Sequence, residues 1–100
     1  MRKIVLLCAA GMSTSMLVVK MQEAAKEIGY KVEIEANAIS NVVNATRGAD
    51  IVLLGPQVRF NLDNVKDKCK GIPVEAIDMV AYGMLDGKAV INHVKKVLED

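Results

Sequence analysis

The chain has 100 residues, of which 52% are hydrophobic and 25% are charged, and its formal net charge is +1. This length predicts one compact domain over residues 1–100 and is too short for two. Balanced charge and only three aromatic residues, Tyr30, Phe60 and Tyr82, argue against a nucleic-acid partner. No segment approaches the roughly 18 apolar residues of a membrane span, and the short apolar N-terminal run does not fit a secretory or lipoprotein signal. We therefore expect a cytoplasmic protein.

Taken in chain order, four short runs predict strands at residues 3–7, 31–36, 50–54 and 73–77. The first and third runs are continuously apolar, which is typical of central strands, whereas the second and fourth alternate as edge strands do. Helical patterns separate the strands. The sequence therefore predicts an α/β fold: an open four-stranded parallel sheet, order 2-1-3-4, with helices on both faces in three layers. This order has a switch point between the first and third strands, where such sheets usually bind ligands.

The helical segments carry apolar stripes that we expect to be buried. One helix is predicted from Ser13 onward and ends at Gly29, and its buried face is formed by Leu17, Met21, Ala24 and Ile28. Met16 and Met21 are interpreted as core residues. The final helix has a stripe of Val90, Ile91, Val94, Val97 and Leu98, with His93 beside it at the surface. Cys69 shares a stripe with Leu62 and Val65, so we interpret it as a small buried apolar residue.

The most informative segment follows the first strand and reads Cys8-Ala9-Ala10-Gly11-Met12-Ser13-Thr14-Ser15. At a strand–loop–helix turn, free backbone N–H groups and the positive end of the helix dipole favour a phosphate-sized anion, and they favour a thiolate over a thiol. Small residues after the cysteine leave the backbone open to an incoming group. We interpret Cys8 as a nucleophile that takes up a phosphoryl group and residues 9–15 as the phosphate-binding loop. The alternative is a small cysteine that merely ends a core strand.

Comparison with known phosphate-binding loops narrows the chemistry. The Walker loop needs two glycines and a lysine, and the dinucleotide fingerprint needs three glycines, but this segment has only Gly11 and no lysine. The tyrosine-phosphatase loop has an arginine six positions after its cysteine, followed by Ser or Thr; these positions hold Thr14 and Ser15. Without the arginine, transfer of the phosphoryl group to water is less stabilised. The segment therefore predicts a phosphocysteine that is kept for another acceptor. The two cysteines lack the spacing and histidine neighbours of a metal site, and we expect no disulfide between them.

Residues 6–17 resemble the start of the IIB component of the sugar phosphotransferase system, lactose/cellobiose (chitobiose) family, and residues 50–59, 72–78 and 82–84 resemble the same family. The resemblance implies a protein-phosphocysteine–sugar phosphotransferase. A phosphohistidine of the EIIA protein phosphorylates Cys8, which passes the phosphoryl group to a sugar held by the membrane component EIIC. The resemblance implies a β-linked disaccharide such as cellobiose or chitobiose. We expect no metal or organic cofactor, because backbone dipoles and the partner's own residues can stabilise the charge.

This role predicts that Cys8 is exposed in a shallow loop, because a donor and an acceptor must both reach it. Candidate partner contacts follow the third and fourth strands, at Pro56, Gln57, Arg59, Asp78 and Tyr82. Arg59 either assists an approaching phosphate or is a surface charge, and Asp78 either caps the next helix or takes part in transfer. We expect a monomer. Two other functions stay open: a phosphatase, and a regulatory domain that only binds anions.

Overall fold

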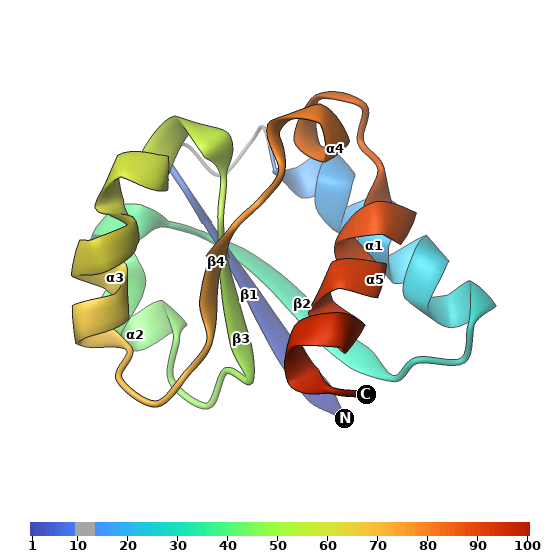
Figure 1. The fold of residues 1–100 in the computed structure, drawn as a ribbon, viewed down its shortest axis with the longest axis horizontal. Coiled ribbons are helices and arrows are strands. Elements are labelled where there is room, and N and C mark those ends of the chain that lie inside the picture. The colour runs from blue at the N-terminus through green and yellow to red at the C-terminus, as the bar shows by residue number, and fades with distance from the viewer. Residues whose placement is uncertain (10–13) are drawn as a thin grey trace.

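The computed structural model describes residues 1–9 and 14–100. Within these residues, strands β1 (Arg2–Cys8), β2 (Val32–Ala38), β3 (Ile51–Leu54) and β4 (Val74–Ala76) form one parallel sheet in the order β2-β1-β3-β4 (Figure 1). The predicted strand order is confirmed. The predicted strand ends are one or two residues off, and the difference that matters is that β1 extends to include Cys8.

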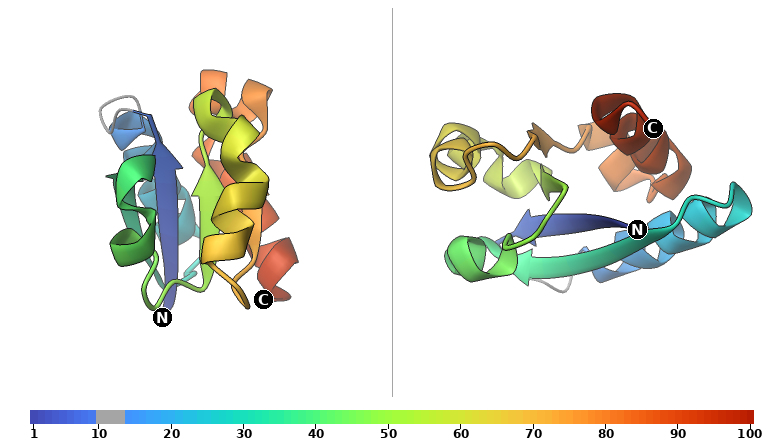
Figure 2. Two further views of the ribbon diagram at one scale, coloured as in Figure 1. Left: turned by 90° about the vertical axis from the view of Figure 1, so that its left-hand side faces the viewer. Right: turned by 90° about the horizontal axis from the view of Figure 1, so that it is seen from below.

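Helices cover both faces of the sheet, as predicted (Figures 1 and 2). On one face lie α1 (Ser15–Glu27), α4 (Met79–Gly83) and α5 (Gly87–Leu98), and on the other lie α2 (Val42–Ala45) and α3 (Leu62–Lys68). Two 3₁₀ helices, η1 (Ile39–Asn41) and η2 (Pro56–Asn61), lead into α2 and α3.

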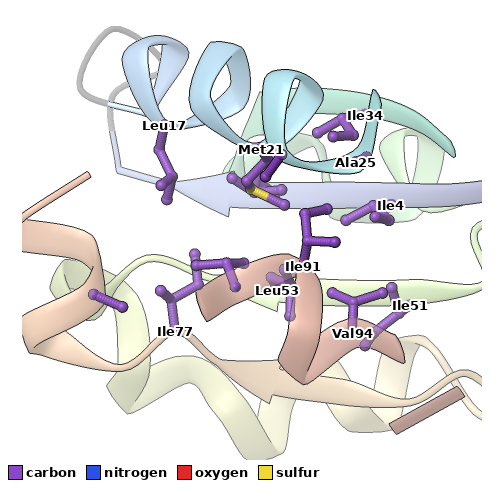
Figure 3. Close-up of a cluster of buried hydrophobic side chains, with 14 residues drawn as sticks. Ile4, Leu17, Met21, Ala25, Ile34, Ile51, Leu53, Ile77, Ile91 and Val94 are labelled. Atoms are coloured by element: carbon purple, nitrogen blue, oxygen red, sulfur yellow. The ribbon is translucent and has the colours of Figure 1, made fainter. Parts of the chain in front are cut away.

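Strand β1 is buried on both faces, which explains why its sequence is continuously apolar. Successive side chains of a strand point to opposite faces. Accordingly, Ile4 and Leu6 pack in the cluster with α1 and α5, whereas Val5 and Leu7 pack in the cluster with α2 and α3. Figure 3 shows the first cluster, in which α1 and α5 face the sheet and each other. By the same alternation, Cys8 belongs to the face that α1 covers.

The predicted buried face of α1 is correct in its middle and wrong at its ends. Leu17, Met21 and Ala24 are buried, but Ile28 is 47% exposed and Met16 is exposed. Ile28 is the C-cap residue, where the chain already leaves the sheet, and Met16 is rotated away from the stripe in the first turn. The adjacent Ala25 is buried in place of Ile28.

The predicted end of α1 at Gly29 is confirmed, and its geometry explains the choice of residue. Gly29 has a φ of +68°, which side chains disfavour. Its N–H donates to the Lys26 carbonyl at 3.2 Å, and the Tyr30 N–H donates to the Ala25 carbonyl at 2.9 Å. This pair of bonds is the Schellman arrangement, which satisfies carbonyls that the helix end leaves without partners.

Two further sequence interpretations are confirmed. Cys69 is buried, and its thiol donates to the Thr46 hydroxyl at 3.3 Å. His93 lies at the surface, where its Nε2 is 3.0 Å from Oε1 of Glu75. Neither residue lies at the carboxyl end of β1.

The two ends of the chain lie side by side, at the edge of the sheet opposite the carboxyl ends of the strands (Figure 1). The guanidinium of Arg2 donates to both carboxylate oxygens of Asp100, at 2.9 and 2.8 Å. The Tyr30 hydroxyl also donates to Asp100, at 2.5 Å. These bonds tie the last residue to the first strand.

Candidate functional site

The candidate nucleophile, Cys8, is the last residue of β1, and β1 lies between β2 and β3 in the sheet. Cys8 is paired with Ala38 of β2, and the Gly55 N–H donates to the Leu7 carbonyl at 2.9 Å. Cys8 therefore occupies the carboxyl edge of the sheet at the predicted switch point.

The thiol of Cys8 is shielded and lies beside a hydroxyl. Its Sγ is 3.3 Å from Oγ1 of Thr14, a distance at which either atom can donate, and 3.9 Å from the Asn37 carbonyl oxygen. Cys8 is 1% exposed and Thr14 is fully buried. The expectation that Cys8 is exposed in a shallow loop is therefore wrong. Cys8 is still part of the strand, so its side chain points under the start of α1.

The structure describes the first residue and the last two residues of the predicted phosphate-binding loop. Ala9 is exposed directly after β1. Thr14 precedes α1, and its carbonyl accepts the Val18 N–H at 2.9 Å; Ser15 is exposed as the first residue of the helix. The remaining predicted loop positions, Ala10, Gly11, Met12 and Ser13, lie outside the described residues. The start of α1 thus borders the Cys8 thiol, as the strand–loop–helix interpretation requires.

The turn after β3 lies against Cys8. A Cβ built on Gly55 would lie 3.6 Å from the Cys8 Cβ and 3.0 Å from Oε1 of Gln57. Cys8 and Gln57 therefore border the same glycine. Pro56 is the first residue of η2 and is partly buried, while Gln57 and Arg59 are exposed. The structure brings this predicted group to the edge where the cysteine lies.

The residues after β4 reach the same edge. The Ile77 N–H donates to the Leu54 carbonyl at 2.8 Å, which continues the pairing of β3 and β4 beyond the strand. Asp78 caps α4, because its Oδ2 accepts the Ala81 N–H at 3.0 Å. The capping interpretation of Asp78 is confirmed. Tyr82 is half-buried in α4.

Sequence reasoning missed a set of exposed apolar side chains at this edge. They lie in η2 and in or just after α4: Phe60, Met79, Val80 and Met84. One signal was present, since Phe60 is the only phenylalanine in the chain and directly follows Arg59. The exposure of the side chains in and just after α4 was not predictable from so short a segment.

We also looked for a cavity, a metal site and a membrane-spanning helix in the described residues. A cavity of about 440 Å³ between β4, α4 and α5 is lined by eight residues, which do not include Cys8. In residues 1–9 and 14–100, no three His, Cys, Asp or Glu side chains gather as they would around a metal ion. Across the same residues, no helix is both long and apolar enough to cross a membrane.

Comparison with known proteins supports one family. Residues 3–93 match the family model of the phosphotransferase system (PTS) lactose/cellobiose-specific IIB subunit. The oligo-beta-mannoside-specific EIIB component of the PTS of Bacillus subtilis (strain 168) is 48% identical over 88% of this chain and 87% of its own length. The galactose-specific EIIB component of Lactococcus lactis subsp. cremoris (strain MG1363) is 45% identical over 88% of each chain. The solution structure of the cellobiose-specific phosphotransferase IIB component from Borrelia burgdorferi has a TM-score of 0.74 and 41% identity, covering 91% of this chain and 85% of that one.

The match spans residues 3–93, which is nearly the whole chain, and the observed sheet order is the one predicted from the strand patterns. With a cysteine at the switch point and these relatives, the chain belongs to the lactose/cellobiose-specific IIB subunits of the sugar phosphotransferase system.

Proposed function

We propose that this protein is a cytoplasmic, monomeric phosphocarrier that accepts a phosphoryl group on Cys8 from a phosphohistidine of EIIA and passes it to a sugar held by EIIC. The observation that carries the proposal is the position of the Cys8 thiol. It ends β1 at the switch point, 3.3 Å from the Thr14 hydroxyl that precedes α1. Family membership supports phosphotransfer in general.

The proposed reaction consists of two displacements at phosphorus. In the first, the sulfur of Cys8 attacks and an S–P bond forms, while the N–P bond of the phosphohistidine breaks with its electron pair going to the imidazole nitrogen, which takes up the proton that the thiol loses. In the second, a sugar hydroxyl oxygen attacks, the S–P bond breaks, and the hydroxyl proton is released as the thiolate departs. Thr14 is close enough to donate a hydrogen bond to that departing thiolate. The N-terminus of α1 adds a favourable field for the anionic phosphoryl group.

The shielding of Cys8 favours a carrier over a phosphatase. Cys8 is 1% exposed, so its thiol is shielded from bulk water, and we expect a phosphoryl group attached to it to be hydrolysed slowly. At the position where a phosphatase loop carries the arginine that assists transfer to water, this chain has Thr14. Slow hydrolysis is what a relay needs, because the phosphoryl group must survive until the next partner arrives.

The sugar is proposed as a β-linked disaccharide of the cellobiose or chitobiose type. The relatives carry three different sugars in their names: oligo-beta-mannoside, galactose and cellobiose. Family membership therefore leaves the sugar to be chosen by experiment. Sugar phosphorylation in vesicles that contain the matching permease, with each sugar in turn, makes that choice.

Intact mass spectrometry tests the relay directly. The protein is incubated with phosphoenolpyruvate, the general phosphotransferase proteins and a cognate EIIA, as wild type and as Cys8→Ser and Cys69→Ser. Cys69 is the matched control, because it is also a buried thiol that contacts a threonine hydroxyl. We expect a gain of one phosphate in wild type and Cys69→Ser and none in Cys8→Ser. A gain in Cys8→Ser, or steady release of inorganic phosphate at a phosphatase-like rate, contradicts the proposal.

A further inference from the structure

Four of the large apolar side chains that are exposed on the surface belong to the two segments, η2 and α4 with the residue after it, that follow β3 and β4 at the carboxyl edge of the sheet. Phe60 is 83% exposed, and Met79, Val80 and Met84 are each at least 60% exposed. Single exposed apolar residues are ordinary, but a group of them at one edge marks an interaction surface. Phenylalanine and methionine are also among the residues enriched in protein interfaces.

One arginine connects the two segments that carry these side chains. The Arg59 guanidinium lies over the Phe60 ring, 5.4 Å from its centre, and its Nη1 is 3.1 Å from the Met79 Sδ. The contact with Met79 joins η2 to the start of α4. We call Arg59, Phe60, Met79, Val80 and Met84 together the rim surface.

The rim surface carries one positive charge that is not neutralised locally. Both contacts of Arg59 are with uncharged groups, and within residues 1–9 and 14–100 it forms no ion pair. Its guanidinium is therefore available to an anion that approaches this edge. An Arg over an aromatic face retains its charge and loses little freedom when it binds.

The rim surface borders Cys8 through backbone that is fixed on both sides. Gly55, directly before η2, lies against the Cys8 Cβ, and the segment leading to α4 is bonded to the end of β3 at Leu54. Figure 1 shows η2, at the start of the yellow-green segment, and α4 at the edge opposite the two termini. A protein that covers this surface is placed at the edge where Cys8 ends β1.

We propose that the rim surface is the docking face for the phosphorylated donor, and that Arg59 attracts its anionic phosphohistidine; this inference rests on the proposed function. The positive charge of Arg59 favours the phosphorylated donor over the permease as the protein that binds here. The donor arrives with an anionic phosphoryl group, whereas the sugar that the permease presents is neutral and gives Arg59 no charge to recognise. The matching face of the donor is an apolar patch around the phosphohistidine.

Steady-state phosphorylation of Cys8 by purified phospho-EIIA tests the docking face. The variants are Phe60→Ala, Met84→Ala and Arg59→Gln, with Arg59→Lys as the conservative replacement. Ile28→Ala is the control, because Ile28 is also an exposed apolar residue but lies at the C-terminal end of α1, away from the rim surface. We expect Phe60→Ala to raise KM for phospho-EIIA at least about tenfold, as truncation of a central aromatic anchor does. The kcat should change less than about twofold, because the Cys8 thiol and the neighbouring Thr14 hydroxyl are retained in these variants.

Arg59 has a separate signature in the salt dependence. The KM of wild type should rise with ionic strength, the KM of Arg59→Gln should be higher and nearly independent of salt, and Arg59→Lys should recover the salt dependence. Since the replaced side chains are exposed, the variants should melt as wild type does. Ile28→Ala should match wild type throughout.

Three outcomes would overturn the proposal while leaving the relay intact. Unchanged KM values with normal phosphorylation of wild type would show that the donor docks elsewhere. A defect confined to the second step, measured as transfer from pre-phosphorylated protein to sugar in permease vesicles, would assign the rim surface to the permease. A change in self-association by sedimentation, with KM unchanged, would assign it to a second copy of this chain. If wild type itself takes up no phosphoryl group, the proposed function fails and the docking face falls with it.

Discussion

The contact between α1 and α5 depends on the absence of a side chain at Gly87. A Cβ built there would lie 2.3 Å from the Lys20 carbonyl carbon, 2.4 Å from the Lys20 oxygen and 2.5 Å from the Met21 nitrogen. All three atoms belong to the backbone of α1, so no side-chain rotation relieves the clash. Gly87→Ala therefore requires the two helices to move apart.

The distance by which α1 and α5 must separate determines how much stability the substitution removes. Ordinary van der Waals contact begins at 3.4 Å, so the backbones must separate by about 1 Å in a region packed like a crystal. Overpacking of this kind lowers the free energy of unfolding by about 1–3 kcal/mol or more. We expect a value near the upper end of this range, because backbone atoms cannot rotate away as a side chain can. The higher helix propensity of alanine returns at most about 1 kcal/mol. We expect a net loss of about 2 kcal/mol, which lowers Tm by roughly 8–16 °C for a domain of this size.

Thermal and urea unfolding, followed by circular dichroism, measure this loss. Gly83→Ala is the control, because Gly83 is also helical and a Cβ there meets nothing within 4 Å. The control should be unchanged or slightly more stable, since alanine reduces the entropy of the unfolded chain. Equal melting temperatures for Gly87→Ala and wild type would refute the close backbone approach.

Two further predictions concern the N-cap of α4 and the dependence of stability on pH. Asp78→Ala removes the N-cap of α4 and should cost about 1 kcal/mol in urea unfolding, whereas Asp78→Ser should retain most of the stability; equal loss in both would contradict capping. Hydrogen bonds from Arg2 and then Tyr30 lower the pKa of Asp100 from 3.8 to about 2. Because this pKa is lower in the folded state, the contribution is complete above pH 3.8 and is lost as the pH falls towards 2. The stability gap between wild type and Arg2→Gln should therefore be constant near neutral pH and shrink below pH 4, and a gap that widens in acid would contradict the pairing.

The fold was predictable because its determinants are local. Continuous apolar runs at β1 and β3 and alternating runs at β2 and β4 set which strands are central. Right-handed connections between neighbouring strands then leave few topologies, and the observed order is the simplest of them. Gly29 was predictable as the end of α1 for the same reason, because its positive φ is required by the local helix-ending turn and does not depend on distant segments.

Features that depend on the packing of distant segments were not predictable. The burial of Cys8 requires knowing that β1 runs one residue further than its apolar pattern and that Thr14 folds over the sulfur. The exposure of Ile28 depends on where α1 overhangs the sheet. Gly87 looks in the sequence like any glycine before a helix, and only the crossing of α5 over α1 shows why a larger residue does not fit.

The shielded thiol and the exposed rim surface suit different parts of one task. The carrier that we propose must keep its phosphoryl group from water, which favours a cysteine that is 1% exposed, and it must also admit two successive partners to the same atom. Recognition and chemistry can then be divided between neighbouring segments. The end of β1 holds the sulfur, while η2 and α4, which follow β3 and β4, present the apolar side chains and the arginine that we propose for docking. Under the proposed function, we expect changes to the rim surface to alter which partner binds and how tightly, and changes at Cys8 and Thr14 to alter the transfer itself.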